Sequence, residues 1–195
     1  MSRRSRGYTL VELLTTIAIL GMTVSIAIPA FGNFGRRRAL RAATAELRGA
    51  FALTRSRAIA TGKNSALKFT QLAGVWHFAA YEDGDGDGVR NDDIAKGIDR
   101  MLEPPRVVLP ESRIVSIGLL RQSIKDPDGD PLPPTKSPVA FNRTTLCSFS
   151  PLGESTPGTI YLTDRGRELW CVRVFGATAK LRVLRYDIAK KRWVQ

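Results

Sequence analysis

The chain has 195 residues, of which 43% are hydrophobic and 25% charged, so it is long enough for a globular domain and is not disordered overall. Its 30 Lys and Arg exceed its 18 Asp and Glu, and the formal net charge of +12 favours an anionic partner such as nucleic acid or lipid headgroups. Two cysteines and one histidine, without a Cys/His cluster, argue against a zinc site or a Cys/His catalytic pair. Since no other nucleophile or acid pair stands out, we predict that the protein is not an enzyme.

The first element is a long apolar run. Residues 8–31 carry Glu12 as their only charge, and as a helix they would extend roughly 30 Å or more, which is enough to cross a bilayer. A buried core helix and a secretory signal peptide are the alternatives, but the run is longer than the core of a typical signal peptide. The arginines among residues 3–6 favour a cytoplasmic N-terminus, although the arginines at 36–38 flank the other end.

Glu12 is the unusual residue of this run. A carboxylate at the centre of a bilayer costs about 2.5–3.5 kcal/mol, and less near an interface, so it needs a partner charge. The stretch around it, "RGYTLVELLTTIAILGMTVSIAIPAF", resembles the N-terminus of type IV prepilins and pseudopilins.

This resemblance implies a processing step and an assembly. A prepilin peptidase would remove residues 1–7, the cytoplasmic leader, by cutting after Gly7, and Tyr8, where Phe is more usual, would become the N-methylated first residue. The helix over 8–31 would anchor the protein as a single pass in the bacterial inner membrane and pack with other pilins or pseudopilins in a filament. Glu12 would then pair with the Tyr8 amine of a neighbour.

Beyond the membrane run the helical pattern resumes. An apolar stripe at helical spacing predicts a face that packs on a sheet, with Thr54 filling its last gap; its apolar members are Leu40, Ala43, Leu47, Phe51 and Ala58. The sequence Thr61-Gly62-Lys63-Asn64 supplies a stop, because glycine is favoured just past the end of a helix.

The rest of the chain predicts antiparallel strands. Short β-branched or aromatic runs, separated by Gly, Pro and Asp, fall at 64–70, 75–83, 113–120, 138–142, 146–151, 158–163, 168–175 and 179–187. We expect an α+β, pilin-like fold in which the long N-terminal helix packs on antiparallel sheet, within a globular domain over residues 32–195 that has one core and lies in the periplasm. Residues 124–138 are too rich in Pro and Asp for a strand and predict an exposed loop.

The C-terminal third narrows the family. The segments "FSPLGESTPGTIYL" and "ELWCVRVFGATAKLRVLRYD", together with the Asp-Gly hairpin after "VWHFAAYE", are similar to GspH/FimT-type minor pseudopilins. The resemblance implies a low-abundance structural subunit near the tip of a type II secretion pseudopilus or a type IV pilus. A bitopic membrane protein that never polymerises is a further alternative.

The other function implied by this family is DNA uptake. Some FimT-type members bind DNA through a Gly-Arg-x-Arg stretch, which would make the chain a filament-associated receptor. The matching place here is Ala179-Lys180-Leu181-Arg182, where alanine and lysine replace the glycine and the first arginine. The period of a strand places Lys180 and Arg182 on one face, and a basic tail with one aromatic follows at 190–193. A surface that is basic for solubility is the alternative.

An acidic loop offers a metal site. Asp83, Asp85 and Asp87 alternate and are followed by Gly88, as in the first half of an EF-hand-like calcium loop. Ile94 occupies the position of the bidentate glutamate, so the Val89 carbonyl and either Asp92 or Asp93 would complete the site. An Asp-Gly hairpin turn without calcium is the alternative.

Two cysteines fall in predicted strands. If the domain lies outside the cytoplasm, we expect a disulfide between Cys147 and Cys171, which would contribute roughly 3–4 kcal/mol in the chain-entropy model. Two buried thiols are the alternative.

Overall fold

α1 (Leu10–Thr61) is one continuous helix of 52 residues, so the membrane run and the second helical pattern are not separated by a break. The computed structural model describes residues 9–108, 114–164 and 167–195, and only the backbone of residues 26–34. The helix ends at the predicted stop, where Gly62 adopts the left-handed conformation with a φ of 66°. The chain divides into two compact units, Met1–Arg38 and Ala39–Gln195.

The first unit has an exposed apolar surface. The large apolar side chains described between Leu10 and Val24 are all at least half exposed, from 51% at Val24 to 75% at Leu10. These side chains have no core of their own to enter. Across the residues that the structure describes, no helix combines the length and hydropathy that a bilayer-crossing helix requires.

In the second unit, the predicted stripe of α1 is buried. Its five apolar members are 0% exposed. Thr54 continues the stripe at 4% exposure because its hydroxyl donates a hydrogen bond to the Ala50 carbonyl at 2.8 Å. The prediction that this face packs on sheet is confirmed.

The first sheet is antiparallel and has the order β3-β2-β1-β9, with β4 also paired to β2. Its longest pairing joins β1 and β2 in full register, from Ser65 opposite Glu82 to Leu72 opposite Val75. The strands of this sheet are β1 (Ser65–Leu72), β2 (Val75–Glu82), β3 (Arg100–Met101), β4 (Arg106–Val107) and β9 (Leu146–Phe149).

The second sheet has the order β13-β12-β11-β10-β5, with β8 also paired to β10. Gly158 permits that pairing, because a Cβ there would lie 2.3 Å from the Ala140 carbonyl oxygen. The strands are β5 (Ser116–Ile117), β8 (Val139–Phe141), β10 (Gly158–Thr163), β11 (Leu169–Val174), β12 (Leu181–Asp187) and β13 (Arg192–Val194).

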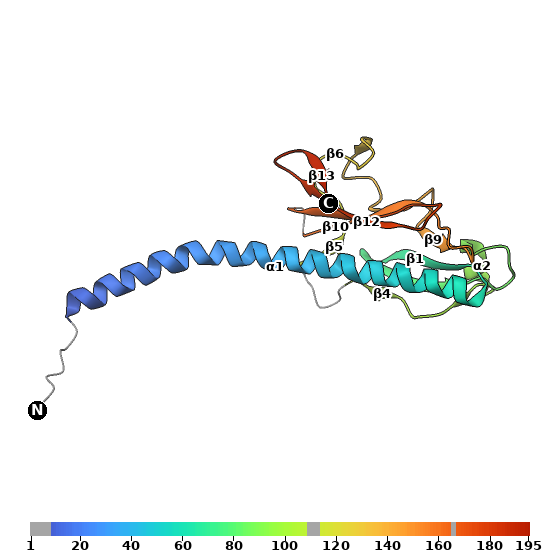
Figure 1. Ribbon diagram of the computed structural model, residues 1–195, viewed down its shortest axis with the longest axis horizontal. Helices are drawn as coiled ribbons and strands as arrows, with labels where there is room; N and C mark the ends of the chain where they lie inside the picture. Colours follow the sequence, from blue (N-terminus) through green and yellow to red (C-terminus); the bar gives the residue numbers. More distant parts are fainter. Residues whose placement is uncertain (1–8, 109–113, 165–166) are drawn as a thin grey trace, which may run out of the picture. The chain divides into compact units, whose positions relative to one another are not determined.

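The main core lies where α1 meets both sheets (Figure 1). The ring of Phe51, on α1, contacts three phenylalanine rings at centroid distances of 6.0–6.2 Å. Two of them belong to the first sheet, Phe69 in β1 and Phe149 in β9, and the third is Phe141 in β8 of the second sheet. One helical side chain therefore ties the two sheets together.

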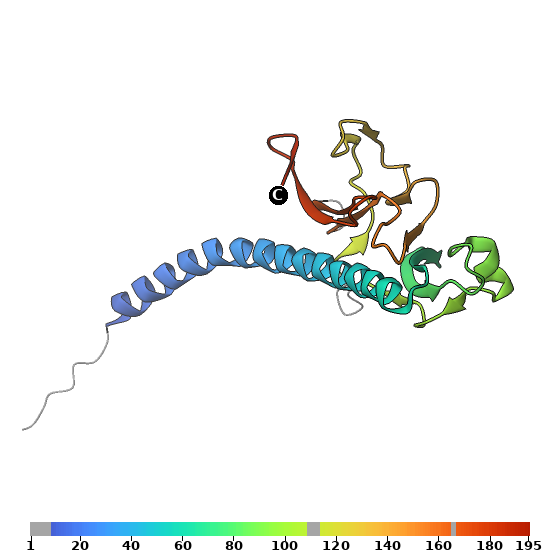
Figure 2. The same ribbon diagram turned by 45° about the vertical axis from the view of Figure 1, so that its right-hand side comes forward.

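A second core corrects the expectation of a single one. Alternate residues of β11, Leu169 and Cys171, point away from α1 and pack with Tyr161, Tyr186 and Leu132. Leu132 belongs to a small hairpin of β6 (Ile124–Lys125) and β7 (Pro131–Leu132). The hairpin lies over the outer side of the second sheet in both views (Figures 1 and 2).

One sequence expectation is therefore wrong. The segment 124–138 is not simply an exposed loop, because Leu132 is 2% exposed and the Asp126 carboxylate caps the hairpin turn by accepting hydrogen bonds from the Asp128 and Asp130 amides. The basic tail at 190–193 ends in a strand of the second sheet. Trp193, in β13, pairs with Tyr186 of β12 and donates its indole N–H to the Lys125 carbonyl at 2.9 Å.

The ring cluster generates a stability prediction. Phe51→Ala should lower the free energy of unfolding by about 3–5 kcal/mol, because it removes a fully buried ring and leaves a cavity. Leu53→Ala, on the same helix but 60% exposed, is the matched control and should change it by less than about 0.5 kcal/mol. Urea denaturation of the full-length protein in detergent, followed by tryptophan fluorescence, measures both. Equal losses for the two variants would contradict the packing.

Candidate functional sites

The N-terminal site is described from Thr9 onward, so Gly7 and Tyr8 lie outside the described residues. Glu12 and Thr9 form a capping box at the start of α1. The Glu12 carboxylate accepts hydrogen bonds from the Thr9 amide at 2.9 Å and the Thr9 hydroxyl at 3.0 Å, and the Thr9 hydroxyl accepts one from the Glu12 amide at 3.3 Å. Glu12 thus has a structural role within its own chain in addition to the one expected from its charge, and Thr-x-x-Glu before an apolar run is a local signal for it.

The acidic loop between β2 and α2 (Asn91–Lys96) is built around the buried carboxylate of Asp83. Its oxygens accept hydrogen bonds from Asn64 Nδ2 at 2.8 Å, the Gly86 amide at 2.8 Å and the Gly88 amide at 2.9 Å. Burial alone would raise the pKa of Asp83, but the hydrogen bonds outweigh it and hold the pKa below its ordinary value. Asp83 therefore organises the loop as an ionised acceptor.

A second buried carboxylate, Asp99, completes the loop, and sequence reasoning did not find it. It accepts hydrogen bonds from the Gly84 amide at 3.2 Å and the Arg90 amide at 2.8 Å. Gly84 must lack a side chain, because a Cβ there would lie 2.0 Å from the Ile98 carbonyl oxygen. Asp99 follows α2, so only the fold brings it to the motif.

Asp85 and Asp87 supply the exposed carboxylates of the loop. One oxygen of each, with one of Asp83, lies within 4.8 Å of the others. Arg90 forms an ion pair with Asp87. Desolvation and the charges of Asp85 and Asp93 raise the pKa of Asp87 above its ordinary value, although Arg90 acts in the opposite direction. The crowding of like charges is the kind of arrangement that a divalent cation relieves.

The remaining predicted calcium ligands differ in their exposure to solvent. Asp92 is exposed in the first turn of α2, whereas Asp93 is buried and lies 3.4 Å from the Lys96 ammonium. The Val89 side chain is buried in a small apolar cluster with Tyr81. The fold thus brings the three alternate aspartates together, while hydrogen bonds within the chain already hold the loop. Calcium binding stays a prediction.

The predicted disulfide is wrong in this structure. Both cysteines lie in the described ranges, and both are free, buried thiols. Cys147 belongs to the main core beneath α1, whereas Cys171 belongs to the second core, on the other side of the second sheet. Burial raises the pKa of both thiols, that of Cys171 to about 12, so both are neutral and unreactive.

Lys180 and Arg182 do not form the predicted common face. β12 begins only at Leu181, after Ala179 with a φ of 49°, so the period of two does not extend back to Lys180. Lys180 lines a groove beside α1, whereas Arg182 lies over the Phe175 ring, with Cζ 5.5 Å from the centroid. DNA binding by these two residues stays a prediction.

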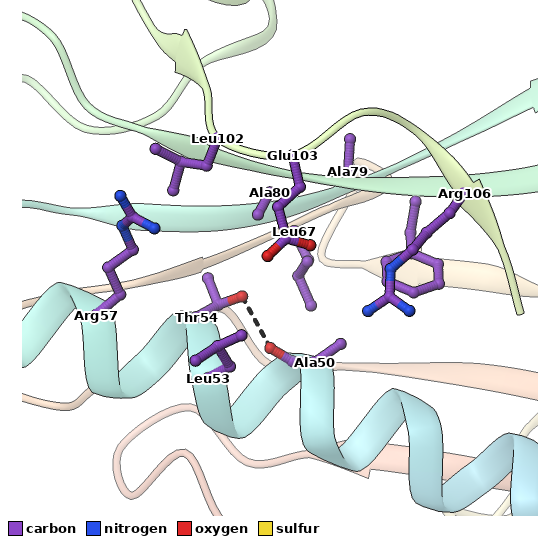
Figure 3. Close-up of a pocket in the computed structure, with 11 residues that line it drawn as sticks. Ala50, Leu53, Thr54, Arg57, Leu67, Ala79, Ala80, Leu102, Glu103 and Arg106 are labelled. Atoms are coloured by element: carbon purple, nitrogen blue, oxygen red, sulfur yellow. Dashed lines mark hydrogen bonds between the residues drawn. The ribbon is translucent and has the colours of Figure 1, made fainter.

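A small cavity lies between α1 and β2. Figure 3 shows Arg57 and Arg106 at its two sides, with Glu103 between them and the Thr54 hydroxyl bonded to the Ala50 carbonyl. Both arginines have acidic partners nearby, at 3.5 Å from Arg57 to Glu82 and at 3.1 Å from Arg106 to Glu46. The cavity volume is about 20 Å³, which is room for a single water and not for an organic substrate.

The acidic loop generates a calcium prediction. If Asp83, Asp85 and Asp87 hold calcium, about a hundredfold excess over the Kd should raise the melting temperature of the full-length protein by roughly 5–10 °C. Asp85→Asn should abolish this rise without changing the calcium-free melt, because Asp83 accepts the shorter hydrogen bonds of the loop and an asparagine oxygen can still accept the 3.4 Å bond from the Asp87 amide. Glu103→Gln, an exposed carboxylate outside the loop, is the matched control and should leave the rise intact. No rise at millimolar calcium would leave the turn without a metal.

Two protein-family models match the sequence. The prokaryotic N-terminal methylation motif matches residues 2–28, and the family described as Type II transport protein GspH matches residues 43–178. Neither the curated proteins nor the solved structures contain a match. Because the second match covers more than half of the chain, the protein belongs to the GspH family and is a minor pseudopilin of a type II secretion system, with an N-terminal methylation motif and membrane anchor region.

Proposed function

We propose that the protein is a structural subunit that enters the pseudopilus near its tip through the N-terminal half of α1. The observation that carries this proposal is the exposure of every large apolar side chain described from Leu10 to Val24. A surface of this kind is stable only in lipid or against other apolar helices. The membrane lipid would cover this surface before assembly, and the apolar helices of neighbouring subunits would cover it in the filament. A tip position fits a low-abundance subunit, because an end occurs once per filament.

The proposed arrangement follows the boundaries set by the sequence. Residues 1–7 are a cytoplasmic leader, residues 8–31 anchor the chain in the inner membrane, and residues 32–195 form the periplasmic domain. The methylation motif implies processing by a prepilin peptidase, and pseudopilins assemble with other pseudopilins. Pseudopilins of this family are structural subunits rather than enzymes.

Glu12 links these two steps in the proposal. After cleavage, the amine of Tyr8 lies next to Thr9, whose amide and hydroxyl already bind the Glu12 carboxylate. In the filament, the carboxylate also meets the amine of a neighbouring chain. The charge of Glu12 then serves assembly, whereas its hydrogen bonds to Thr9 serve the start of the helix.

The first prediction from this proposal concerns processing. The mature chain should begin with N-methylated Tyr8, and Gly7→Ala or a larger residue should leave the leader attached, because a side chain crowds the peptidase's approach to the backbone. Mass spectrometry of the N-terminal peptide from membranes measures the start. An intact leader in the wild-type chain, or a start at another residue, would refute the proposal.

The second prediction separates the two roles of Glu12. Glu12→Gln keeps a side chain that can serve in a capping box but removes the charge, so filament incorporation should fall at least about tenfold while membrane insertion stays intact or improves. Thr9→Ala is the complementary control: it removes the cap, at about 1 kcal/mol, but keeps the charge and should assemble nearly as the wild type does. Immunoblots of sheared filaments measure incorporation, and gold labelling locates the subunit. If Glu12→Gln assembles normally, capping is the only role of Glu12.

A further inference from the structure

A basic groove lies between α1 and the turn that precedes β12. It has a volume of about 300 Å³, and three cationic side chains line it: Arg48, Arg55 and Lys180. Phe51 and Phe149 form an apolar floor and are at most 1% exposed. Among the described residues that line the groove, none is acidic.

The cations of this groove have no acidic partner among the residues that the structure describes. Arg48, Arg55 and Lys180 form no side-chain ion pair in the described ranges, and Arg55 Nε is a buried donor without a hydrogen-bond acceptor there. On the same helix, Arg57 does have a partner, Glu82, at 3.5 Å. A guanidinium that is partly removed from water without a counter-charge is costly, so a carboxylate from outside the chain would stabilise Arg55.

An exposed apolar rim adjoins these cations. Leu152 is 89% exposed and Ile59 is 51% exposed. The loop that carries Leu152 lies beside both Arg55 and Ile59, because a Cβ added to Gly153 would lie 3.1 Å from Arg55 Nη2 and 3.7 Å from Ile59 Cδ1. Arginine and exposed apolar side chains in one patch are typical of the centre of a protein interface.

The same features disfavour a nucleic acid as the occupant. Phe51 and Phe149 are buried in the floor, so neither offers a face on which a base could stack. Leu152 and Ile59 would meet phosphates without any compensating contact. A protein segment with a carboxylate beside an apolar side chain complements both the cations and the rim.

We propose that this groove docks a neighbouring pseudopilin subunit through an acidic side chain of that subunit. The carboxylate pairs with Arg55 and Lys180, and an apolar neighbour of that side chain covers Leu152 and Ile59. This inference rests on the proposed function, because it names a surface by which the assembled subunit meets its neighbour outside the N-terminal helix.

The test in cells places a photo-crosslinking amino acid at Leu152 of the full-length chain and, separately, at Leu13. The groove is supported if the probe at Leu152 captures another pseudopilin and the crosslinked residue of that partner lies next to an Asp or Glu. Capture at Leu13 alone overturns the groove but leaves the proposed function standing. Capture of a pseudopilin at neither position refutes the proposed function and the groove together.

Charge variants in the same cells test the chemistry. Arg55→Lys keeps the charge but loses the planar guanidinium that can hold a carboxylate through two nitrogens, and with Lys180→Gln it should lower the Leu152 crosslink at least about tenfold. Arg41→Gln removes an exposed arginine of the same helix outside the groove and should change the crosslink less than about twofold. An equal loss in all these variants would overturn the specific role of the groove. Thermal melts of the purified variants confirm that each is folded.

A binding assay on the full-length protein in detergent distinguishes the class of partner. The probe is a fluorescent peptide of alternating Glu and Leu, with a Lys and Leu peptide as its control. Binding of the acidic peptide that Arg55→Lys weakens about tenfold or more supports the proposal. Binding of duplex DNA that depends on Arg55 and Lys180, without binding of the acidic peptide, overturns it in favour of a nucleic acid.

Discussion

The burial of one face of α1 is the constraint on which the second unit depends. Phe51 meets rings from both sheets, so neither sheet can shift along the helix without opening the main core. The buried stripe also fixes the rotation of the helix about its axis. Arg48 and Arg55 consequently lie beside Lys180 and cannot turn to the other flank, where Arg57 and Arg106 find acidic partners.

Much of this architecture could be predicted from the sequence, because period and turn chemistry are local signals. The strand at 158–163 agrees with β10 to the residue, and the helix stops at Thr61 as Gly62 requires. Two-residue strands such as β3 and β4 carry no period and were not predicted. The second core had a local signal, because β11 is apolar on both faces, a pattern that indicates burial on both sides of a sheet. Its cover had none, because β6 and β7 lie in a segment rich in Pro and Asp.

The sites show the same division between local and distant signals. Alternate aspartates placed Asp83, Asp85 and Asp87 together correctly, because their spacing is local. Asp99 and the meeting of Arg55 with Lys180 depend on residues far apart in the chain, so no motif could reveal them. The capping box of Thr9 and Glu12 was visible in the sequence but was overlooked, because the carboxylate was interpreted only as a charge within an apolar run.

The separation of the two thiols has a consequence for the order in which the chain matures. Cys147 and Cys171 lie in different cores with a sheet between them, so an oxidant can join them only before that sheet has closed. In the native chain each thiol is sealed from water and held protonated, and oxidation has no route to either. A disulfide between the two would thus mark a chain that was oxidised before it had folded, and a non-reducing gel would detect it.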